Sequence, residues 1–366
     1  MKGIDNKLNQ IFQGDCLDLF RDIPDNSIDM TFADPPFNLK KKYSSYKDSL
    51  EFQEYLDWCK KWIFEMVRVT KPTGSIFLHN IPKWLTYYTT YLNEVAHFKH
   101  WISWDAPSAP MGKSLQPAHY GILFYGKEIK GTKINELRYP HKRDRKQGYL
   151  LKDYGGKKAK IHPFGPLVSD VWTDIHRIKH NKKRDPHPCQ LPIHLLDRLI
   201  LLSTDENDIV LDPFSGTGTT AISAKRLDRN FIGFELDQEY LNISKEKLSF
   251  VKPNYKLGDS WISFYLNNAV TIRNKDWNNI KEFYDVPEPA KIIDYKAIKL
   301  KDKKLIPPSN YCNVNVEQKK KVAKRSNDQQ KIINFNHLEI NRHQHIRSTE
   351  NKTTHNKIRD SVPIRH

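Results

Sequence analysis

The sequence predicts an α/β fold built on a doubly wound, mostly parallel sheet. Short apolar segments of strand length alternate with longer segments of helical periodicity. A basic stretch interrupts this alternation once, after which it resumes. Such alternation joins parallel strands through right-handed crossovers. The chain has 366 residues, 38% hydrophobic and 11% aromatic, which suffices to bury a core. We therefore expect one sheet assembled from two α/β halves.

The first half of the predicted sheet is residues 1–125. Its apolar segments of strand length are residues 10–15, 27–33, 75–79, 101–104 and 120–125, with the last two paired antiparallel. A short helix is predicted between the first two strands. A longer helix is predicted over residues 52–69, where apolar residues recur at helical spacing, and the turn at residues 71–74 ends it.

A second half, residues 186–250, repeats the rhythm. Its predicted elements are a helix at 192–203, a strand at 209–211, a helix from 217, a strand at 231–234 and a helix at 238–250. The stretch 126–185 between the halves is rich in Lys, Arg, His, Gly and Pro and is predicted to be an irregular basic insertion. Residues 251–314 form a C-terminal extension, and the polar, basic residues 315–366 are expected to be disordered.

The charge of the chain points to a polyanionic partner. The net charge is +17 and the isoelectric point is near 9.4, and clustered Lys and Arg displace counterions from phosphates. Composition alone leaves DNA, RNA and anionic lipid open. The chain lacks an apolar run of 18 residues and a signal-peptide pattern, so we expect a cytoplasmic protein outside the membrane. Its four cysteines form no C-x-x-C pair, which argues against a metal site or disulfides.

The segment Asp34-Pro35-Pro36-Phe37 directly follows a predicted strand, at the edge of the sheet where open α/β folds bind ligands. An isolated Asp-Pro-Pro is equally consistent with a simple turn. An exocyclic amine is a poor nucleophile, and a carboxylate with a proline carbonyl can accept its hydrogen bonds. An aromatic side chain beside them can stack on a base that has been flipped out of a duplex. The pattern therefore suits chemistry on a base amino group.

A second motif, residues 212–220 (DPFSGTGTT), follows another strand and opens a helix. Its glycines allow backbone to approach a ligand at the helix N-terminus, although the loop lacks the third glycine of the dinucleotide fingerprint. Glu235 ends the next strand, 17 residues after Gly218, where a carboxylate suits ribose hydroxyls. Asp237 is predicted to be the N-cap of the following helix.

Together, these residues resemble the DNA amino-methyltransferases of bacterial modification systems in their β permutation, in which Asp-Pro-Pro-[Tyr/Phe] comes first, the target-recognition region next and the glycine loop last. The resemblance covers roughly residues 10–250. It implies a permuted, Rossmann-like S-adenosylmethionine-dependent methyltransferase fold. It also implies that residues 126–185 recognise the target sequence in double-stranded DNA.

The resemblance assigns site residues one by one. Catalysis falls to Asp34, Pro35, Pro36 and Phe37. Cofactor contacts fall to Asp15, Cys16, Asp34, Asp212, Phe214, Ser215, Gly216, Thr217, Gly218, Thr219 and Glu235. The segment 187–192 (HPCQLP) resembles a family segment beside the cofactor, with Cys189 and Leu191 in place of the usual hydroxyl residue and Lys.

Basic residues are the expected DNA contacts, although charge runs are usually solvated faces. The candidates are Lys40, Lys41, Lys42, His141, Arg143, Arg145, Arg177, Lys182 and Lys183, with His162, Trp172 and His176 as further contributors. The expected function is methyl transfer from S-adenosylmethionine to adenine N6 within a restriction-modification system, whose partner is a cognate endonuclease. Relatives often form homodimers.

Several alternatives remain open. Cytosine N4 is one, although the family's N4 enzymes more often carry Ser in place of Asp34. An RNA amino-methyltransferase and a catalytically silent DNA-binding specificity subunit are two others. A cytosine C5 mechanism through Pro188-Cys189 is disfavoured, because in those enzymes the nucleophilic cysteine follows the cofactor loop, whereas Cys189 precedes Gly216.

Overall fold

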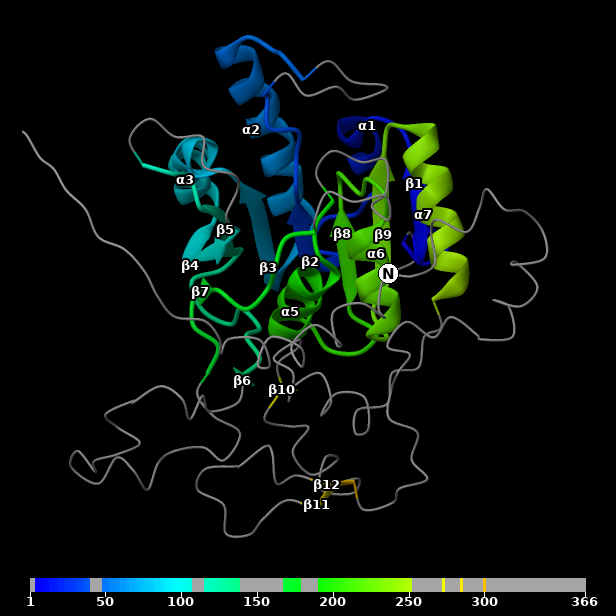
Figure 1. Cartoon of the computed structure of the whole chain (residues 1–366). Helices are drawn as coiled ribbons and strands as arrows, with labels where there is room; N and C mark the ends of the chain where they lie inside the picture. Colours follow the sequence, from blue (N-terminus) through cyan, green and yellow to red (C-terminus); the bar gives the residue numbers. More distant parts are fainter. Residues whose placement is uncertain are drawn as a thin grey trace, which may run out of the picture.

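The computed structural model describes residues 4–39, 48–106, 115–138, 167–178 and 190–251, together with the backbone of three short strands further on. Figure 1 shows these parts as one twisted sheet with helices on both faces. The three short strands are β10 (Ile272–Arg273), β11 (Tyr284–Asp285) and β12 (Lys299–Leu300). β10 pairs with β6 (Leu137–Arg138), which connects the C-terminal extension to the insertion, and β11 pairs with β12.

The sheet has eight strands in the order β1-β9-β8-β2-β3-β5-β4-β7. Their bounds in that order are Gln10–Gln13, Asn230–Glu235, Ile209–Asp212, Ile28–Ala33, Thr70–Asn80, His119–Gly126, His97–Asp105 and Val171–Trp172. In this sheet β5 alone runs against the other strands, since its pairs with β3 and β4 are antiparallel and all other pairs are parallel. The doubly wound, mostly parallel sheet is confirmed.

The two halves of the chain meet at the centre of the sheet. β2, from the first half, pairs with β8, from the second, through Met30 with Val210 and Thr31 with Leu211. The order of strands thus changes direction between β2 and β8. Open α/β sheets place ligands at the carboxyl ends of strands beside such a switch point. Both predicted motifs follow these two strands directly.

Helices cover each face of the sheet over its own hydrophobic core. One face carries α1 (Cys16–Phe20), α2 (Phe52–Val69) and α3 (Pro82–Val95), and the other carries α5 (Ile193–Ser203), α6 (Thr219–Arg226) and α7 (Gln238–Phe250). Neighbouring strand residues alternate between the cores: Phe77 belongs to the α5–α7 side, whereas Ile76 and Leu78 belong to the α1–α3 side. The sheet is therefore buried on both faces, as parallel sheets are.

The sequence missed α3 and predicted other helices closely. The helices at 52–69 and 238–250 have the predicted bounds. α3 escaped because its segment, PKWLTYYTTYLNEV, is rich in Thr and Tyr, which favour strands. Its helical signal is the Pro at the first turn and the burial of Trp84, Leu85, Tyr88 and Leu92.

The turn predicted at residues 71–74 belongs to β3, which starts at Thr70. Ile28 pairs with Thr70 but Met30 pairs with Ser75, so one residue of β2 lies between these pairs against four of β3, and β3 bulges there. Gly74 is required inside the bulge, because a Cβ there would lie 2.8 Å from the carbonyl oxygen of Asp29. The prediction of a turn outside the strand was wrong.

Part of the insertion is also regular. β7 adds to the edge of the main sheet beside β4, and Trp172 is 1% exposed. Its indole N–H donates to the carbonyl of Ser169, and the Arg198 guanidinium lies 4.9 Å from its ring centroid. Arg198 also pairs with Asp174 through two hydrogen bonds of 3.0 and 2.6 Å. The expectation that Trp172 contributes to DNA contact was wrong, because its side chain belongs to the core.

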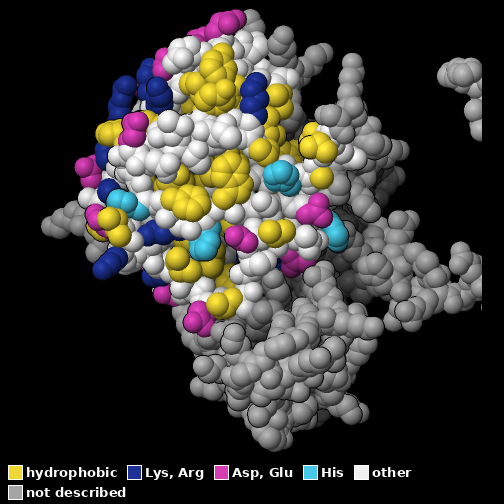
Figure 2. Space-filling view, turned by 90° about the vertical axis from the view of Figure 1, so that its left-hand side faces the viewer, with side chains coloured by type: hydrophobic (Ala, Val, Ile, Leu, Met, Phe, Trp, Pro, Cys, Tyr) yellow, Lys and Arg dark blue, Asp and Glu magenta, His cyan; other side chains and the backbone are white. Residues whose placement is uncertain are grey.

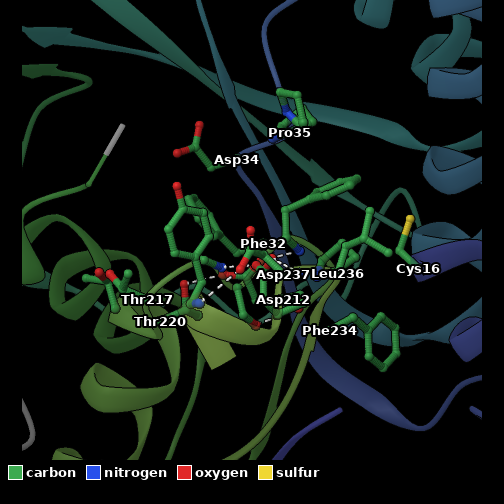
Figure 3. Close-up of a pocket in the computed structure, with 18 of the residues that line it drawn as sticks. Cys16, Phe32, Asp34, Pro35, Asp212, Thr217, Thr220, Phe234, Leu236 and Asp237 are labelled. Atoms are coloured by element: carbon green, nitrogen blue, oxygen red, sulfur yellow. Dashed lines mark hydrogen bonds between the residues drawn. The ribbon is translucent and has the colours of Figure 1, made fainter. Parts of the chain in front are cut away.

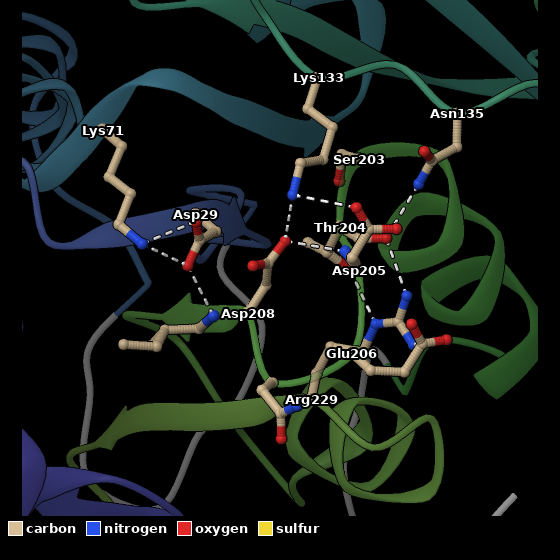
Figure 4. Close-up of polar contacts among 12 residues, drawn as sticks. Asp29, Lys71, Lys133, Asn135, Ser203, Thr204, Asp205, Glu206, Asp208 and Arg229 are labelled. Atoms are coloured by element: carbon tan, nitrogen blue, oxygen red, sulfur yellow. Dashed lines mark hydrogen bonds and ion pairs between the residues drawn. The ribbon is translucent and has the colours of Figure 1, made fainter.

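Polar contacts tie the start of the insertion to the second half at the amino edge of the sheet (Figure 4). Lys133 Nζ lies 2.6 Å from Asp208 and 3.3 Å from Asp205, and Asn135 donates to the carbonyls of Leu201 and Thr204. These contacts lie at the opposite end of β8 from Asp212. They fix the chain that leaves β5 against the loop between α5 and β8.

The surface over α3 and β4 is rich in hydrophobic side chains (Figure 2). Tyr87 of α3 and Phe98 of β4 are 42% and 54% exposed. No helix in the described ranges is long and apolar enough to cross a membrane.

Candidate active site

The two predicted motifs line one pocket at the carboxyl edge of the sheet (Figure 3). Asp34 follows β2, Asp212 ends β8, Glu235 ends β9, and α1 begins beside them at Cys16. Predicted site residues in the lining are Asp15, Cys16, Asp34, Pro35, Pro36, Asp212, Phe214, Ser215, Gly216, Thr217, Thr219 and Glu235. Gly218 and Phe37 lie outside this lining. Folding therefore brings together residues that are about 200 positions apart in the sequence.

The tetrapeptide Asp34-Pro35-Pro36-Phe37 is held by side chains from α2 and α3. The Tyr55 hydroxyl donates to the carbonyl of Pro36 at 2.7 Å, and the Trp84 indole N–H donates to the carbonyl of Phe37 at 2.6 Å. Tyr55 is in turn 2.9 Å from the hydroxyl of Tyr88. The sequence gave no signal for these roles beyond aromatic residues at helical spacing, which equally indicate a core.

The chain after Phe37 turns back through Asn38, which has a φ of 52°. The buried carboxylate of Asp48 accepts the backbone N–H groups of Asn38 at 2.7 Å and Leu39 at 2.9 Å. The Asn38 side chain exchanges two hydrogen bonds with the backbone of Leu50. Asp48, which the sequence did not single out, therefore fixes the exit from the tetrapeptide.

Phe37 lies outside the pocket lining, among other aromatic rings. It is 3% exposed, and its ring centroid is 5.9 Å from that of His79 and 6.1 Å from that of Tyr120. Arg177, a predicted DNA contact, lies 5.5 Å from the Tyr120 ring. His79 and Tyr120 were missed by the sequence, because they are far from either motif along the chain.

Asp212 is buried and both of its carboxylate oxygens accept hydrogen bonds. One accepts the N–H of Phe214 at 2.9 Å and the other accepts the Thr220 hydroxyl at 2.5 Å. Burial raises the pKa of Asp212 to about 7, and the nearby carboxylates of Asp34 and Glu235 act in the same direction. A cation bound in the site would therefore stabilise the ionised form of Asp212.

Glu235 clamps the glycine loop. Its two oxygens accept the N–H of Gly216 at 2.7 Å and of Asp237 at 2.8 Å. Burial raises the pKa of Glu235 above its usual range. Asp237 caps α7 by accepting from the N–H groups of Glu239 and Tyr240, which confirms the predicted N-cap.

Gly218 supports the loop from behind. It has a φ of 82° at the N-cap of α6, and a Cβ on it would lie 2.8 Å from Cβ of Ser244 on α7. Both the backbone conformation and the helix packing therefore favour glycine at this position.

At the start of α1, Asp15 accepts the N–H of Leu17 at 2.8 Å and so acts as N-cap. Burial raises the pKa of the Cys16 thiol well above its usual range, so this side chain stays protonated. Cys189 and most predicted DNA contacts lie outside the described residues, namely Lys40, Lys41, Lys42, His141, His162, Arg143, Arg145, Lys182 and Lys183.

The pocket suits a ligand that is cationic at one point and flat and apolar at another. The lining contains five carboxyl groups, those of Asp15, Asp34, Asp212, Glu235 and Asp237. Trp58, Phe214 and Leu236 supply apolar surface. The described lining contains no Lys or Arg, so no basic side chain within it pairs with these carboxylates.

Comparisons with known proteins identify the family of the chain. The DNA methylase family model matches residues 28–246. M.BamHI of Bacillus amyloliquefaciens, a type II methyltransferase, is 44% identical over 252 residues, covering 68% of this chain and 59% of the relative. M.HpaI of Haemophilus parainfluenzae, also a type II methyltransferase, is 36% identical over 234 residues, covering 62% of this chain and 70% of the relative.

Solved structures also align with the chain. The cytosine-N4-specific PvuII DNA methyltransferase has a TM-score of 0.49 at 21% identity, covering 67% of this chain and 87% of its own. A complex of M1.HpyAVI with S-adenosylmethionine has a TM-score of 0.42 at 22% identity, covering 65% and 97%. The sequence matches, rather than these alignments, establish the relationship.

Proposed function

Because the chain belongs to the DNA methylase family, we propose that it is a site-specific DNA methyltransferase that modifies an exocyclic amino group in duplex DNA with S-adenosylmethionine as methyl donor. The observation that carries this proposal is the meeting of Asp34 with Asp212 and the glycine loop at one pocket. One motif suits the base and the other suits the cofactor. The similarity to type II methyltransferases supports the further proposal that the chain works in restriction-modification, in the cytoplasm and beside a cognate endonuclease.

The pocket fits S-adenosylmethionine by the chemistry of its donors. When bound, the cofactor supplies an electrophilic methyl group on a positively charged sulfur. Asp212 and Glu235 offer carboxylates to its cationic and hydroxyl groups, and Phe214 and Leu236 offer apolar contact. The raised pKa of Asp212 marks a carboxyl whose ionised form a bound cation would stabilise.

Asp34 and Pro35 would orient the target amine. In the described part of the chain, the carboxylate of Asp34 has one hydrogen bond, and the carbonyl of Pro35 has none. The two can accept both N–H groups of the amine and favour a tetrahedral, nucleophilic nitrogen. Phe37 stacks on the flipped base, which repays part of the few kcal/mol that flipping costs. Catalysis here is chiefly positioning.

We favour adenine N6 over cytosine N4 as the acceptor, because position 34 is Asp, which is more frequent than Ser in adenine enzymes. The basic charge supplies phosphate contacts. Arg177, whose guanidinium lies 5.5 Å from the Tyr120 ring, is the described residue that we assign to DNA. A homodimer remains part of this proposal.

The function is tested with Asp34→Ala. Wild-type protein is expressed in cells whose DNA carries no modification, and long-read sequencing reports the modified base and its site. Asp34→Ala should abolish the modification while leaving S-adenosylmethionine binding intact, because Asp212 and the glycine loop remain. Asp57→Ala, which removes an exposed carboxylate from α2, is the matched control and should retain activity.

The outcomes separate the candidates. N4-methylcytosine in the sequenced DNA would replace adenine as the target. Transfer to RNA but not to DNA would favour an RNA methyltransferase, and failure to bind S-adenosylmethionine would favour a silent DNA-binding subunit. Full activity of Asp34→Ala would overturn the assigned catalytic centre.

A further inference from the structure

His79 lies directly beside the proposed catalytic carboxylate. β2 and β3 run parallel with Ala33 opposite Leu78, so the next residue of each strand brings Asp34 beside His79 at the carboxyl edge. His79 Nδ1 is 2.8 Å from Asp34 Oδ1, and His79 is 2% exposed. This contact joins residues that are 45 positions apart in the sequence, and His79 belongs to neither motif.

The proton of this hydrogen bond lies on the imidazole. An ionised carboxylate accepts hydrogen bonds and cannot donate them, so Nδ1 carries the hydrogen and donates to Oδ1. This is the one hydrogen bond of the Asp34 carboxylate within the described ranges. With Oδ1 engaged, Oδ2 is the oxygen left for a substrate amine.

Packing holds the imidazole in place. Its ring centroid is 5.1 Å from that of Tyr120, 5.8 Å from that of Trp104 and 5.9 Å from that of Phe37. Nε2 is buried and has no hydrogen-bond partner among the described residues. A polar ring with one unsatisfied buried nitrogen is a costly core residue, whereas Phe or Leu would fill the same space without that cost. The hydrogen bond to Asp34 is therefore the contact that explains a histidine at this buried position.

We propose that His79 is a positioning residue for methyl transfer, which fixes the Asp34 carboxylate through Nδ1 so that Oδ2 accepts the amino group of the target base. This inference rests on the proposed function. Donation to Oδ1 restricts rotation about the bond that joins the carboxyl group to its methylene. It therefore acts on the geometry of the reacting amine while leaving the S-adenosylmethionine contacts of Asp212 and Glu235 unchanged.

Two substitutions distinguish positioning from packing. His79→Phe keeps an aromatic ring among Phe37, Tyr120 and Trp104 but removes the donor. His79→Asn removes the ring but keeps a donor, since the Asn side-chain N–H₂ group lies near the position of Nδ1. Positioning predicts that His79→Phe lowers kcat by about 10²-fold, the cost of a misplaced reacting group, and that His79→Asn restores most of it. A packing role predicts the reverse order.

The measurements are kcat for methylation of a duplex that carries the recognised site, the affinity for S-adenosylmethionine and the melting temperature. We expect kcat to change while cofactor affinity stays at the wild-type value in both variants. His100→Phe, an exposed histidine of β4, is the matched control and should match wild type in all three. Nitrogen NMR of the unsubstituted protein should show the hydrogen of His79 on Nδ1.

Each result decides the inference. Equal or higher kcat in His79→Phe than in His79→Asn would overturn it, and so would a hydrogen found on Nε2 alone. If the wild-type protein methylates no nucleic acid, the proposed function fails instead. In that case, the NMR result still reports whether Nδ1 donates to Asp34.

Discussion

Three carboxylates at the pocket differ in how their residues hold them. Glu235 accepts two backbone N–H groups, Asp34 accepts from His79, and Asp212 accepts from Phe214 and Thr220 in full burial. Because Asp212 is buried, its ionised form is disfavoured and its pKa is raised to about 7. The same residue that makes the site receptive to a cation is a source of pH-dependent instability without one.

The pH dependence of stability follows from this pKa. Unfolded Asp ionises near pH 4, whereas folded Asp212 keeps its proton up to about pH 7. Its stabilising contribution is present below pH 4 and is lost as the pH rises through 7. Ligand-free wild type should lose free energy of unfolding relative to Asp212→Asn between pH 5 and 7, at up to about 1.4 kcal/mol per pH unit.

Chemical denaturation at several pH values checks this prediction. Asn at position 212 can still accept from the Phe214 N–H and can donate to the Thr220 hydroxyl, so the fold should be retained. A constant difference between the two proteins from pH 5 to 8 would contradict the raised pKa.

At the scale of elements, the pocket depends on how closely α6 and α7 approach. Gly218 begins α6 against Ser244 of α7, and Tyr55 and Trp84 reach from α2 and α3 to the carbonyls after Pro35. Helices on both faces of the sheet thus hold the two motifs. α6 and α7 meet at Gly218. α2 and α3 hold the tetrapeptide, and Trp58 and Trp62 of α2 also pack against Phe214.

Gly218→Ala tests the helix packing, and Gly131→Ala is its matched control. Both glycines have positive φ values, 82° and 88°, but a Cβ at Gly131 meets only Thr73, at 3.9 Å. Gly131→Ala should cost about 1 kcal/mol of unfolding free energy, the strain of left-handed backbone. Gly218→Ala should cost about 1–3 kcal/mol more, as overpacking does, and should weaken S-adenosylmethionine binding.

Denaturant titration and calorimetric binding measure both effects. Adding Ser244→Gly to Gly218→Ala should recover part of the loss, because it removes the Cβ that the new methyl group meets. Equal losses in the two alanine variants would show that backbone strain alone accounts for Gly218.

At the scale of the whole molecule, a few polar contacts join the sheet and its helices to the basic insertion. Lys133 and Asn135 fix the insertion where it leaves β5, and the Arg198–Asp174 pair fixes it where it returns beside β7. Arg177 comes three residues after Asp174, and its guanidinium lies 5.5 Å from the Tyr120 ring. The chain as a whole carries a net charge of +17, which favours a polyanionic partner.

Salt dependence tests the role of that charge. If the chain neutralises 6–10 phosphates, DNA affinity should fall by about 10³–10⁵-fold between 50 and 200 mM salt, because released counterions drive binding. S-adenosylmethionine affinity over the same range should change little, since its contacts are buried. Arg177→Ala should reduce the slope of log affinity against log salt by about 1, as loss of one phosphate contact does. An unchanged slope would remove Arg177 from the DNA contacts.

The sequence by itself determined the fold class, the strands that carry each motif and the residues of the motifs. Alternation of apolar strands with helical periods is local information, so the helix at 52–69 and the N-cap at Asp237 could be predicted. The order of the two motifs along the chain was likewise sufficient to identify the family. These features depend on neighbours within a few residues.

Tertiary structure alone decided what surrounds the motifs. Pairing of β2 with β3 places His79 beside Asp34, and packing of α2 and α3 directs Tyr55 and Trp84 to the tetrapeptide. It also moves Trp172 from a predicted DNA contact into the core. A single sequence specifies which residues are apolar or polar but not which distant strands become neighbours. Hydrogen bonds across those neighbours therefore become visible only once the sheet is assembled.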